Sequence, residues 1–170
     1  MVRDVDLLGG CAMTEATIPR ATYRLQLTAD FGFEAATRLV PYLAALGISH
    51  LYVSPILTAR KDSTHGYDTI RFDEISPHLG GRDGFERLVR TLREHGMGIV
   101  VDFVPNHVGV GGDENALWLD LLEWGRQSNA AGWFDIDWSR NRGKLLVPFL
   151  GEPYGRVLAS GGLALKFDPT

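Results

Sequence analysis

The sequence predicts an α/β fold built on a parallel sheet. Three short segments, residues 22–27, 48–53 and 98–102, are rich in β-branched, aromatic and other apolar residues and are typical of strands. The segments between them carry apolar residues at helical spacing, so strands and helices alternate along the chain. This alternation predicts parallel strands joined by right-handed crossovers, with any chemistry on the loops that follow the carboxyl ends of the strands.

The first strand–helix unit occupies residues 22–47. Residues 22–27 alternate in the way that a half-buried strand does. After a turn at residues 31–33, a helix is predicted from apolar residues at helical spacing, which are Ala36, Leu39, Val40, Leu43 and Leu46. Gly47 is a suitable stop for this helix, and Pro41 predicts a kink or a late helix start.

A long polar loop, rich in Gly, Asp, Ser and His, is predicted over residues 57–82. Asp83 is the predicted N-cap of a second helix, whose apolar residues at i, i+3, i+4 and i+7 are Phe85, Leu88, Val89 and Leu92. Gly96 ends this helix. The apolar run that follows at residues 98–102 predicts a strand buried on both faces.

Residues 113–170 are predicted to form an insertion after the third strand, because the strand–helix rhythm stops there. A helix is expected over residues 115–126, and a dense aromatic and acidic stretch follows at 133–138. Residues 144–150 are a candidate short strand.

The composition is that of a globular protein, with 45% apolar and 22% charged residues, and 170 residues make one domain or part of one. The chain has 17 Lys and Arg against 21 Asp and Glu, a net charge of −4, which argues against nucleic-acid and membrane partners. No apolar run reaches the roughly 18 residues of a spanning helix. The single Cys11 excludes an intramolecular disulfide.

Residues 1–17 are predicted to be a disordered leader, with Met13 as an alternative start. This segment has no apolar stretch of about 7–15 residues, so a secretory signal is not expected. The missing signal and the single cysteine together predict a cytoplasmic location.

Asp102, Asn106 and His107 follow the third predicted strand directly. A carboxylate, an amide and an imidazole at the mouth of a parallel sheet offer the donors and acceptors that bind sugar hydroxyls. The alternative is that Asp102 and Asn106 satisfy backbone amides of the loop and that His107 is a surface residue.

His65, Gly66 and Tyr67 lie in the loop after the second predicted strand. Gly66 permits a close approach of a ligand or of backbone. Tyr67 can stack on the apolar face of a pyranose while its hydroxyl reaches a polar group. The alternative is a glycine turn beside a packed tyrosine.

Trp118 and Trp124 are predicted to be core residues, because they fall at helical spacing with leucines. Trp133 and Trp138 lie among carboxylates and stay open as sugar-stacking residues.

Other chemistries find little support in the sequence. Glycoside hydrolysis needs two carboxylates that flank the scissile bond, but nothing in their spacing marks Asp135 and Asp137 as that pair. The histidines show no paired metal-ligand spacing, and no glycine-rich phosphate motif is present. The sequence therefore predicts no metal and no cofactor.

Residues 102–107, Asp-Phe-Val-Pro-Asn-His, resemble the first signature region of the α-amylase family of glycoside hydrolases (family 13). Residues 65–67 resemble the motif of that family that follows its second barrel strand. Within the family the chain is most similar to trehalose-forming members, over about residues 19–168. The stretches that carry this similarity are residues 21–27, 40–60, 125–126 and 134–138.

The resemblance implies a fold and a reaction. Residues 18–112 would hold about three strands of a (β/α)8 TIM barrel, and residues 113–170 an insertion, so that the barrel is incomplete. The reaction implied is the conversion of the reducing-end α-1,4 link of a maltooligosaccharide into an α,α-1,1 link. This is an intramolecular transglucosylation, an isomerisation used in trehalose biosynthesis.

The resemblance also implies roles for individual residues. Tyr67 would stack on the sugar before the reacting bond, and His107 would hydrogen-bond that sugar with help from His65. Asp102 would brace the site as an acceptor at the strand end, and Asn106 would hold the following loop.

The catalytic carboxylates of the family come from later barrel strands, so no catalytic residue is predicted within this chain. The isolated chain is expected to be inactive, with the C-terminal part of the same enzyme as its missing partner. Three alternatives stay open. They are a fragment of an amylase-type α-glucan hydrolase or transferase, a non-catalytic sugar-binding module, and a chain that does not fold alone because a partial barrel exposes a sheet edge and apolar surface.

Overall fold

The computed structural model describes residues 18–147 and 149–167. The chain divides into two units, Met1–Asn115 and Ala116–Thr170. The predicted boundary between residues 112 and 113 lies close to this division. The predicted leader of residues 1–17, with Cys11 and Met13, lies outside the described residues.

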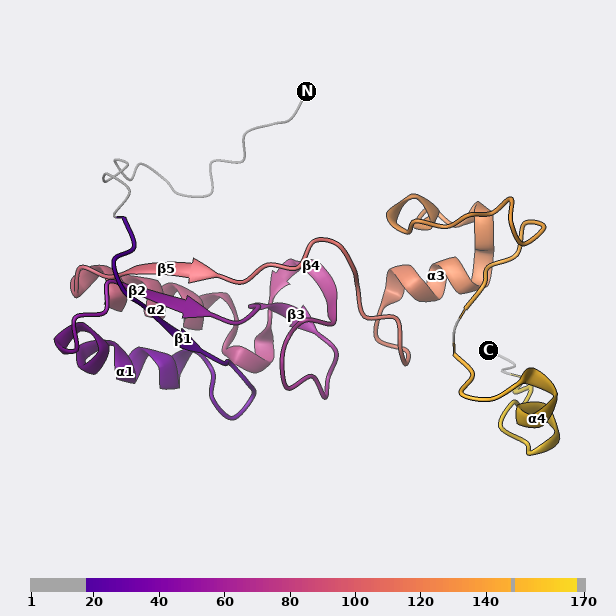
Figure 1. The fold of residues 1–170 in the computed structure, drawn as a ribbon, viewed down its shortest axis with the longest axis horizontal. Coiled ribbons are helices and arrows are strands. Elements are labelled where there is room, and N and C mark those ends of the chain that lie inside the picture. Colours follow the sequence, from indigo (N-terminus) through magenta and orange to yellow (C-terminus); the bar gives the residue numbers. More distant parts are fainter. Residues whose placement is uncertain (1–17, 148, 168–170) are drawn as a thin grey trace, which may run out of the picture. The chain divides into compact units, whose positions relative to one another are not determined.

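The first unit is built on a three-stranded sheet of β1 (Thr22–Leu25), β2 (His50–Val53) and β5 (Gly98–Val101), in the order β1-β2-β5 (Figure 1). Both neighbouring pairs are parallel, and Leu51 lies opposite Tyr23 on one side and Ile99 on the other. The predicted parallel pairing is confirmed. Each strand ends within two residues of the predicted position.

Helices α1 (Phe33–Ala45) and α2 (Gly81–Glu94) cover one face of this sheet. The apolar side chains of that face share a single core with the helices. Its fully buried large members are Phe33, Val40, Leu43, Leu51, Val53, Leu88 and Leu92. The burial of most of both helical stripes explains why helical spacing located α1 and α2 correctly; Leu46, predicted to belong to the first stripe, is the C-cap of α1 and is 56% exposed.

The ends of the two helices differ in part from the predictions. Helix α1 begins at Phe33 and runs through Pro41, so the late start is wrong, whereas Gly47 follows the helix with φ of 86° as a stop should. Helix α2 begins at Gly81, with Gly80 as its N-cap at φ of 110°. Asp83 is therefore not the cap but lies in the first turn, where its charge favours the helix dipole.

The predicted loop over residues 57–82 is largely ordered, which contradicts the prediction. It contains an antiparallel hairpin of β3 (Leu57–Ala59) and β4 (Thr69–Ile75), followed by a 3₁₀ turn, η1 (Pro77–Leu79). The hairpin is irregular, with register shifts on both sides of Thr58. Because β4 carries charged side chains on an exposed strand, its composition resembles that of a loop.

The prediction that residues 98–102 form a strand buried on both faces is also wrong for the described residues. Val100 of β5 is 38% exposed, whereas Ile99 and Val101 pack against the core. The reason is that α1 and α2 cover only one face of the sheet and that β5 is an edge strand.

The second unit contains α3 (Ala116–Trp124), two 3₁₀ turns, η2 (Gly125–Gln127) and η3 (Ala131–Trp133), and α4 (Tyr154–Ala159). Helix α3 fulfils the prediction of a helix over residues 115–126. The candidate strand at 144–150 is not formed by the residues described there, and α4 was not predicted.

Trp118 and Leu121 of α3 are buried, and the Trp118 ring packs against Phe134 and Phe149 at centroid distances of 5.4 and 6.1 Å. The core assignment of Trp118 is thus confirmed. Trp124 is 56% exposed, so its core assignment is wrong. Among the described residues, no helix combines the length and apolar character needed to span a membrane.

Candidate functional site

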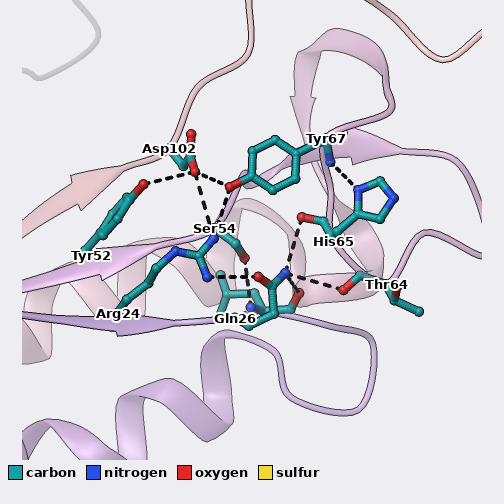
Figure 2. A network of polar contacts seen from close by, with 9 residues as sticks. Arg24, Gln26, Tyr52, Ser54, Thr64, His65, Tyr67 and Asp102 are labelled. Atoms are coloured by element: carbon teal, nitrogen blue, oxygen red, sulfur yellow. Dashed lines mark hydrogen bonds and ion pairs between the residues drawn. The ribbon is translucent and has the colours of Figure 1, made fainter.

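The side chains of the uncovered sheet face form a polar network at the carboxyl ends of the strands (Figure 2). Side chains alternate along a strand, so Arg24, Tyr52 and Val100 lie in register on the face opposite the helices. Two residues further along the three segments, the same alternation reaches Gln26, Ser54 and Asp102. The alternation of the strands thus brings polar residues from three chain segments to one edge.

Asp102 is the acceptor at the centre of this network. One of its carboxylate oxygens, Oδ2, accepts hydrogen bonds from the hydroxyls of Tyr52, at 3.1 Å, and Tyr67, at 2.5 Å. The Arg24 guanidinium lies 3.9 Å from the same oxygen, and the Asp102 side chain is 17% exposed. Asp102 is thus an acceptor for two tyrosines at the strand end, and its role in bracing a sugar site stays a prediction.

Tyr67 uses its hydroxyl both as donor and as acceptor. It donates to Asp102 and accepts a hydrogen bond of 3.1 Å from Arg24 Nη2. The bond to Asp102 is the largest cause that raises the pKa of Tyr67, because ionisation would place two negative oxygens together; the bond from Arg24 acts in the opposite direction.

His65 is placed beside Tyr67 by the turn between them. The Tyr67 backbone N–H donates to His65 Nδ1 at 3.0 Å, and the two rings are stacked at 5.9 Å with an angle of 28°. His65 and Tyr67 therefore lie together, as the sequence predicted, with His65 exposed and Tyr67 partly buried.

Gly66 is required by the shape of this turn. Its φ is 79°, and a Cβ at this position would lie 3.0 Å from the carbonyl oxygen of Pro55. Its N–H donates to Ser63 Oγ at 3.0 Å, and that hydroxyl also contacts Asp68. The glycine lets the loop pack closely onto the end of β2; of the two close approaches predicted for it, by a ligand or by backbone, the structure shows that of backbone.

Gln26 ties the same loop to β1. Its Nε2 donates to the carbonyl oxygens of Thr64 and His65, at 3.4 and 3.3 Å, while its Oε1 accepts from Arg24 Nη1 at 3.0 Å. Sequence reasoning placed Gln26 at a strand end but assigned no role to it, to Arg24 or to Tyr52. The alternation within residues 22–27 was the available signal, since it places Arg24 and Gln26 on one face.

Asn106 and His107 are exposed and contact each other, with Asn106 Oδ1 3.1 Å from His107 Nδ1. The contacts of the described residues do not join either side chain to Tyr67 or Asp102. The structure therefore brings Asp102, Tyr67, His65 and Gly66 together but leaves His107 outside the network.

The loop that carries His107 is fastened further along, against the β3–β4 hairpin. Arg60 lies across Gly109 and Gly111, where a Cβ would come within 3.0 and 2.7 Å of its side chain, and its Nε lies 3.6 Å from Glu114 Oε2. Asn115 Nδ2 donates to the Gly109 carbonyl at 2.9 Å. These contacts anchor the segment after the loop, whereas the contact described for Asn106 is with His107, and its role in holding the loop stays a prediction.

The acidic pair of the second unit does not resemble a catalytic pair. Asp137 accepts hydrogen bonds from the backbone N–H groups of Ser139 and Arg140, at 3.0 and 3.1 Å, and from the Ser139 hydroxyl. These bonds, chiefly that from the Ser139 hydroxyl, lower the pKa of Asp137. Asp135 and Asp137 are both exposed.

Comparison with known proteins first defines the class. The model of the alpha amylase catalytic domain matches residues 34–149, most of the chain, and the chain therefore belongs to the alpha-amylase family. It is also 39% identical over 95 residues to the intracellular maltogenic amylase of Bacillus subtilis (strain 168), a match covering 56% of this chain and 15% of that protein.

The similarity to one kind of family member is more extensive. The chain is 47% identical over 163 residues to a putative maltooligosyl trehalose synthase of Mycobacterium tuberculosis (strain ATCC 25618 / H37Rv), a match covering 88% of this chain and 21% of that protein. The solved structure of maltooligosyltrehalose synthase from Arthrobacter ramosus has a TM-score of 0.80 and 43% identity, covering 89% of this chain and 19% of that one. The chain thus spans about a fifth of the length of these relatives.

Proposed function

We propose that this chain is part of a trehalose-forming enzyme with (1→4)-α-D-glucan 1-α-D-glucosylmutase activity. The observation that carries the proposal is the 47% identity, over 88% of the chain, to the mycobacterial protein named as a putative maltooligosyl trehalose synthase. Similarity to the maltogenic amylase covers 56% of the chain, at lower identity. The more extensive match supports the synthase over an amylase-type hydrolase.

The proposed reaction moves one glycosidic bond without net use of water. An enzyme carboxylate forms a bond to C1 of the penultimate glucose as the bond from C1 to O4 of the reducing-end glucose breaks, and a carboxylic acid of the enzyme protonates O4. The anomeric hydroxyl of the released glucose then attacks C1 and gives its proton to that same carboxyl group, so that the α,α-1,1 link forms and the first carboxylate leaves. The catalytic carboxylates belong, in this proposal, to barrel strands outside the present chain.

The part assigned to this chain is a donor-sugar subsite on the uncovered sheet face. Tyr67 is partly exposed, stands at the carboxyl end of the sheet and has its hydroxyl fixed by Asp102 and Arg24. A fixed aromatic ring next to hydrogen-bonding groups is the arrangement that binds a pyranose, which has apolar CH faces and polar hydroxyl edges. His65, which stacks beside Tyr67, and His107, which lies outside the network in this structure, are the proposed hydrogen-bonding partners of the sugar.

Incubation of the purified 170-residue chain with maltopentaose tests this division of roles. We expect saturable binding without turnover, measured by calorimetry and by chromatography of the sugars. Trehalose-ended product would contradict the assignment of the catalytic carboxylates to strands outside the chain. Release of glucose or maltose would instead support an amylase-type hydrolase.

A further inference from the structure

Strand β1 presents two long polar side chains, Arg24 and Gln26, to the loop that carries Tyr67 (Figure 2). They are two residues apart, so the strand repeat places both on the uncovered face. Neither belongs to the motifs that follow β2 and β5. Their contacts nevertheless reach the Tyr67 hydroxyl and the backbone on the N-terminal side of Gly66.

Arg24 joins the strand to the loop through two N–H groups of its guanidinium. Its Nη1 donates to Gln26 Oε1 at 3.0 Å and its Nη2 to the Tyr67 hydroxyl at 3.1 Å, while the guanidinium lies over the Tyr52 ring at 5.4 Å. Two diverging N–H groups on one rigid plane are a property of arginine that lysine lacks. The stack on Tyr52 limits the rotation of that plane.

Gln26 connects Arg24 to the backbone of the loop. Its Oε1 is occupied by Arg24, which directs its Nε2 to the carbonyl oxygens of Thr64 and His65. The loop is therefore held at two places, at the backbone before Gly66 and at the phenol of Tyr67. The tyrosine ring lies between these places, with its hydroxyl bonded to Asp102.

We propose that Arg24 and Gln26 are positioning residues that fix the orientation of the Tyr67 ring and of the 63–68 loop, and so shape the donor-sugar subsite. This inference deepens the proposed function and rests on it for the identity of the sugar. The residues act through Tyr67, and no contact of their own with the sugar is required.

A double-mutant cycle on the 170-residue chain tests the proposal. Arg24→Met and Tyr67→Phe each remove the bond between Arg24 and the phenol, and we expect each to weaken maltopentaose binding about tenfold. The double variant should lose no more than either single variant, because both changes release the same ring. Arg24→Lys keeps the positive charge but lacks the two diverging N–H groups, so it should recover only part of the affinity that Arg24→Met loses.

Arg38→Met is the matched control for this cycle. Arg38 lies on α1 and forms an exposed ion pair with Glu34, so the change removes the same charge away from the network. It should leave the affinity for maltopentaose unchanged. Losses that add in the double variant, or an Arg24→Met chain that binds as tightly as the parent, would overturn the proposal.

A second measurement needs no sugar and separates this inference from the proposed function. The phenol of Tyr67 is titrated by NMR of ¹³C-labelled tyrosine rings, assigned with Tyr67→Phe. Arg24→Met should raise the pKa of Tyr67 further, because the bond from Arg24 favours the ionised phenol. Gln26→Leu should shift the Tyr67 ring signals, while Arg38→Met should change neither.

The two measurements distinguish the two claims. If the parent chain does not bind maltopentaose, the proposed sugar-binding role fails, and the titration alone decides the positioning role. A Tyr67 pKa and ring signals that are the same in the parent and in Arg24→Met would overturn the positioning role, whether or not the sugar binds.

Discussion

The two units of the chain bury their apolar side chains to very different extents. In Met1–Asn115, two helices and three strands contribute to one core, and Phe33, Leu51 and Leu88 are all fully buried. In Ala116–Thr170, Trp133 is 71% exposed and Leu146 75% exposed. Helices stacked on a sheet bury their apolar stripes in a shared core, whereas the short helices and turns of the second unit bury few large side chains, among them Trp118 and Leu121.

The largest expected effect comes from the core. Phe33→Ala removes a fully buried ring that packs edge-on against Phe85 at 5.6 Å, and it should cost about 3–5 kcal/mol of unfolding free energy. Trp133→Ala removes a mostly exposed ring of the second unit and should stay within about 0.5 kcal/mol. Urea unfolding followed by circular dichroism measures both. Similar losses for the two variants would contradict the contrast between the units.

Smaller losses of unfolding free energy are expected when alanine replaces two glycines that share a positive φ but differ in their surroundings. Gly66→Ala should cost about 1–3 kcal/mol, since left-handed backbone is combined with a close approach to the Pro55 carbonyl oxygen. Gly161→Ala, with φ of 74° and open space around it, should cost only the backbone strain of about 1 kcal/mol. Equal costs in the same urea titrations would show that the packing of the 63–68 loop adds nothing.

The smallest effects are expected from pH, and they have opposite signs in the two units. The pKa of Tyr67 is raised in the folded chain. Its bond to Asp102 therefore stabilises the fold fully when the pH is below the tyrosine pKa of the unfolded chain, about 10, and this contribution is lost as the pH rises through the pKa of the folded chain. The pKa of Asp137 is lowered in the folded chain. Its hydrogen bonds therefore stabilise the fold when the pH is above the aspartate pKa of the unfolded chain, about 3.9, and this contribution is lost as the pH falls through the pKa of the folded chain. Both groups are solvent-accessible, which keeps both effects small.

Unfolding midpoints across the pH range check these signs. The difference between the parent and Tyr67→Phe should shrink on the alkaline side, and that between the parent and Asp137→Asn on the acid side. A Tyr67→Phe difference that grows above pH 10 would mean that the bond to Asp102 does not favour the neutral phenol.

The sequence predicted the elements whose side chains meet one core. Helical spacing located α1 and α2 because the burial of Val40 and Leu88 requires it, and the apolar run of β5 likewise marked a strand. The same reasoning missed β3 and β4, because an exposed hairpin with Arg71 and Asp73 has no buried stripe to detect.

For the site, the sequence indicated which residues carry chemistry but not how they meet. Tyr67 and Asp102 are 35 residues apart, and only the packing of the loop onto the sheet joins them. Arg24 was missed because an alternating strand shows which face a side chain takes and not which partner it finds. His107 belongs to the same motif as Asp102, yet it lies on an exposed loop, where no core fixes its position.

The central claim is that the network around Tyr67 and Asp102 is where this chain binds a maltooligosaccharide. Titration of the ¹⁵N-labelled chain with maltopentaose, followed by NMR, tests it most directly, with Tyr67→Ala and Trp138→Ala as paired variants. We predict saturable shifts at Tyr67, Asp102 and their neighbours that Tyr67→Ala abolishes and Trp138→Ala leaves intact. Shifts confined to Trp133 and Trp138 of the second unit, or no saturable shift at all, would contradict the claim.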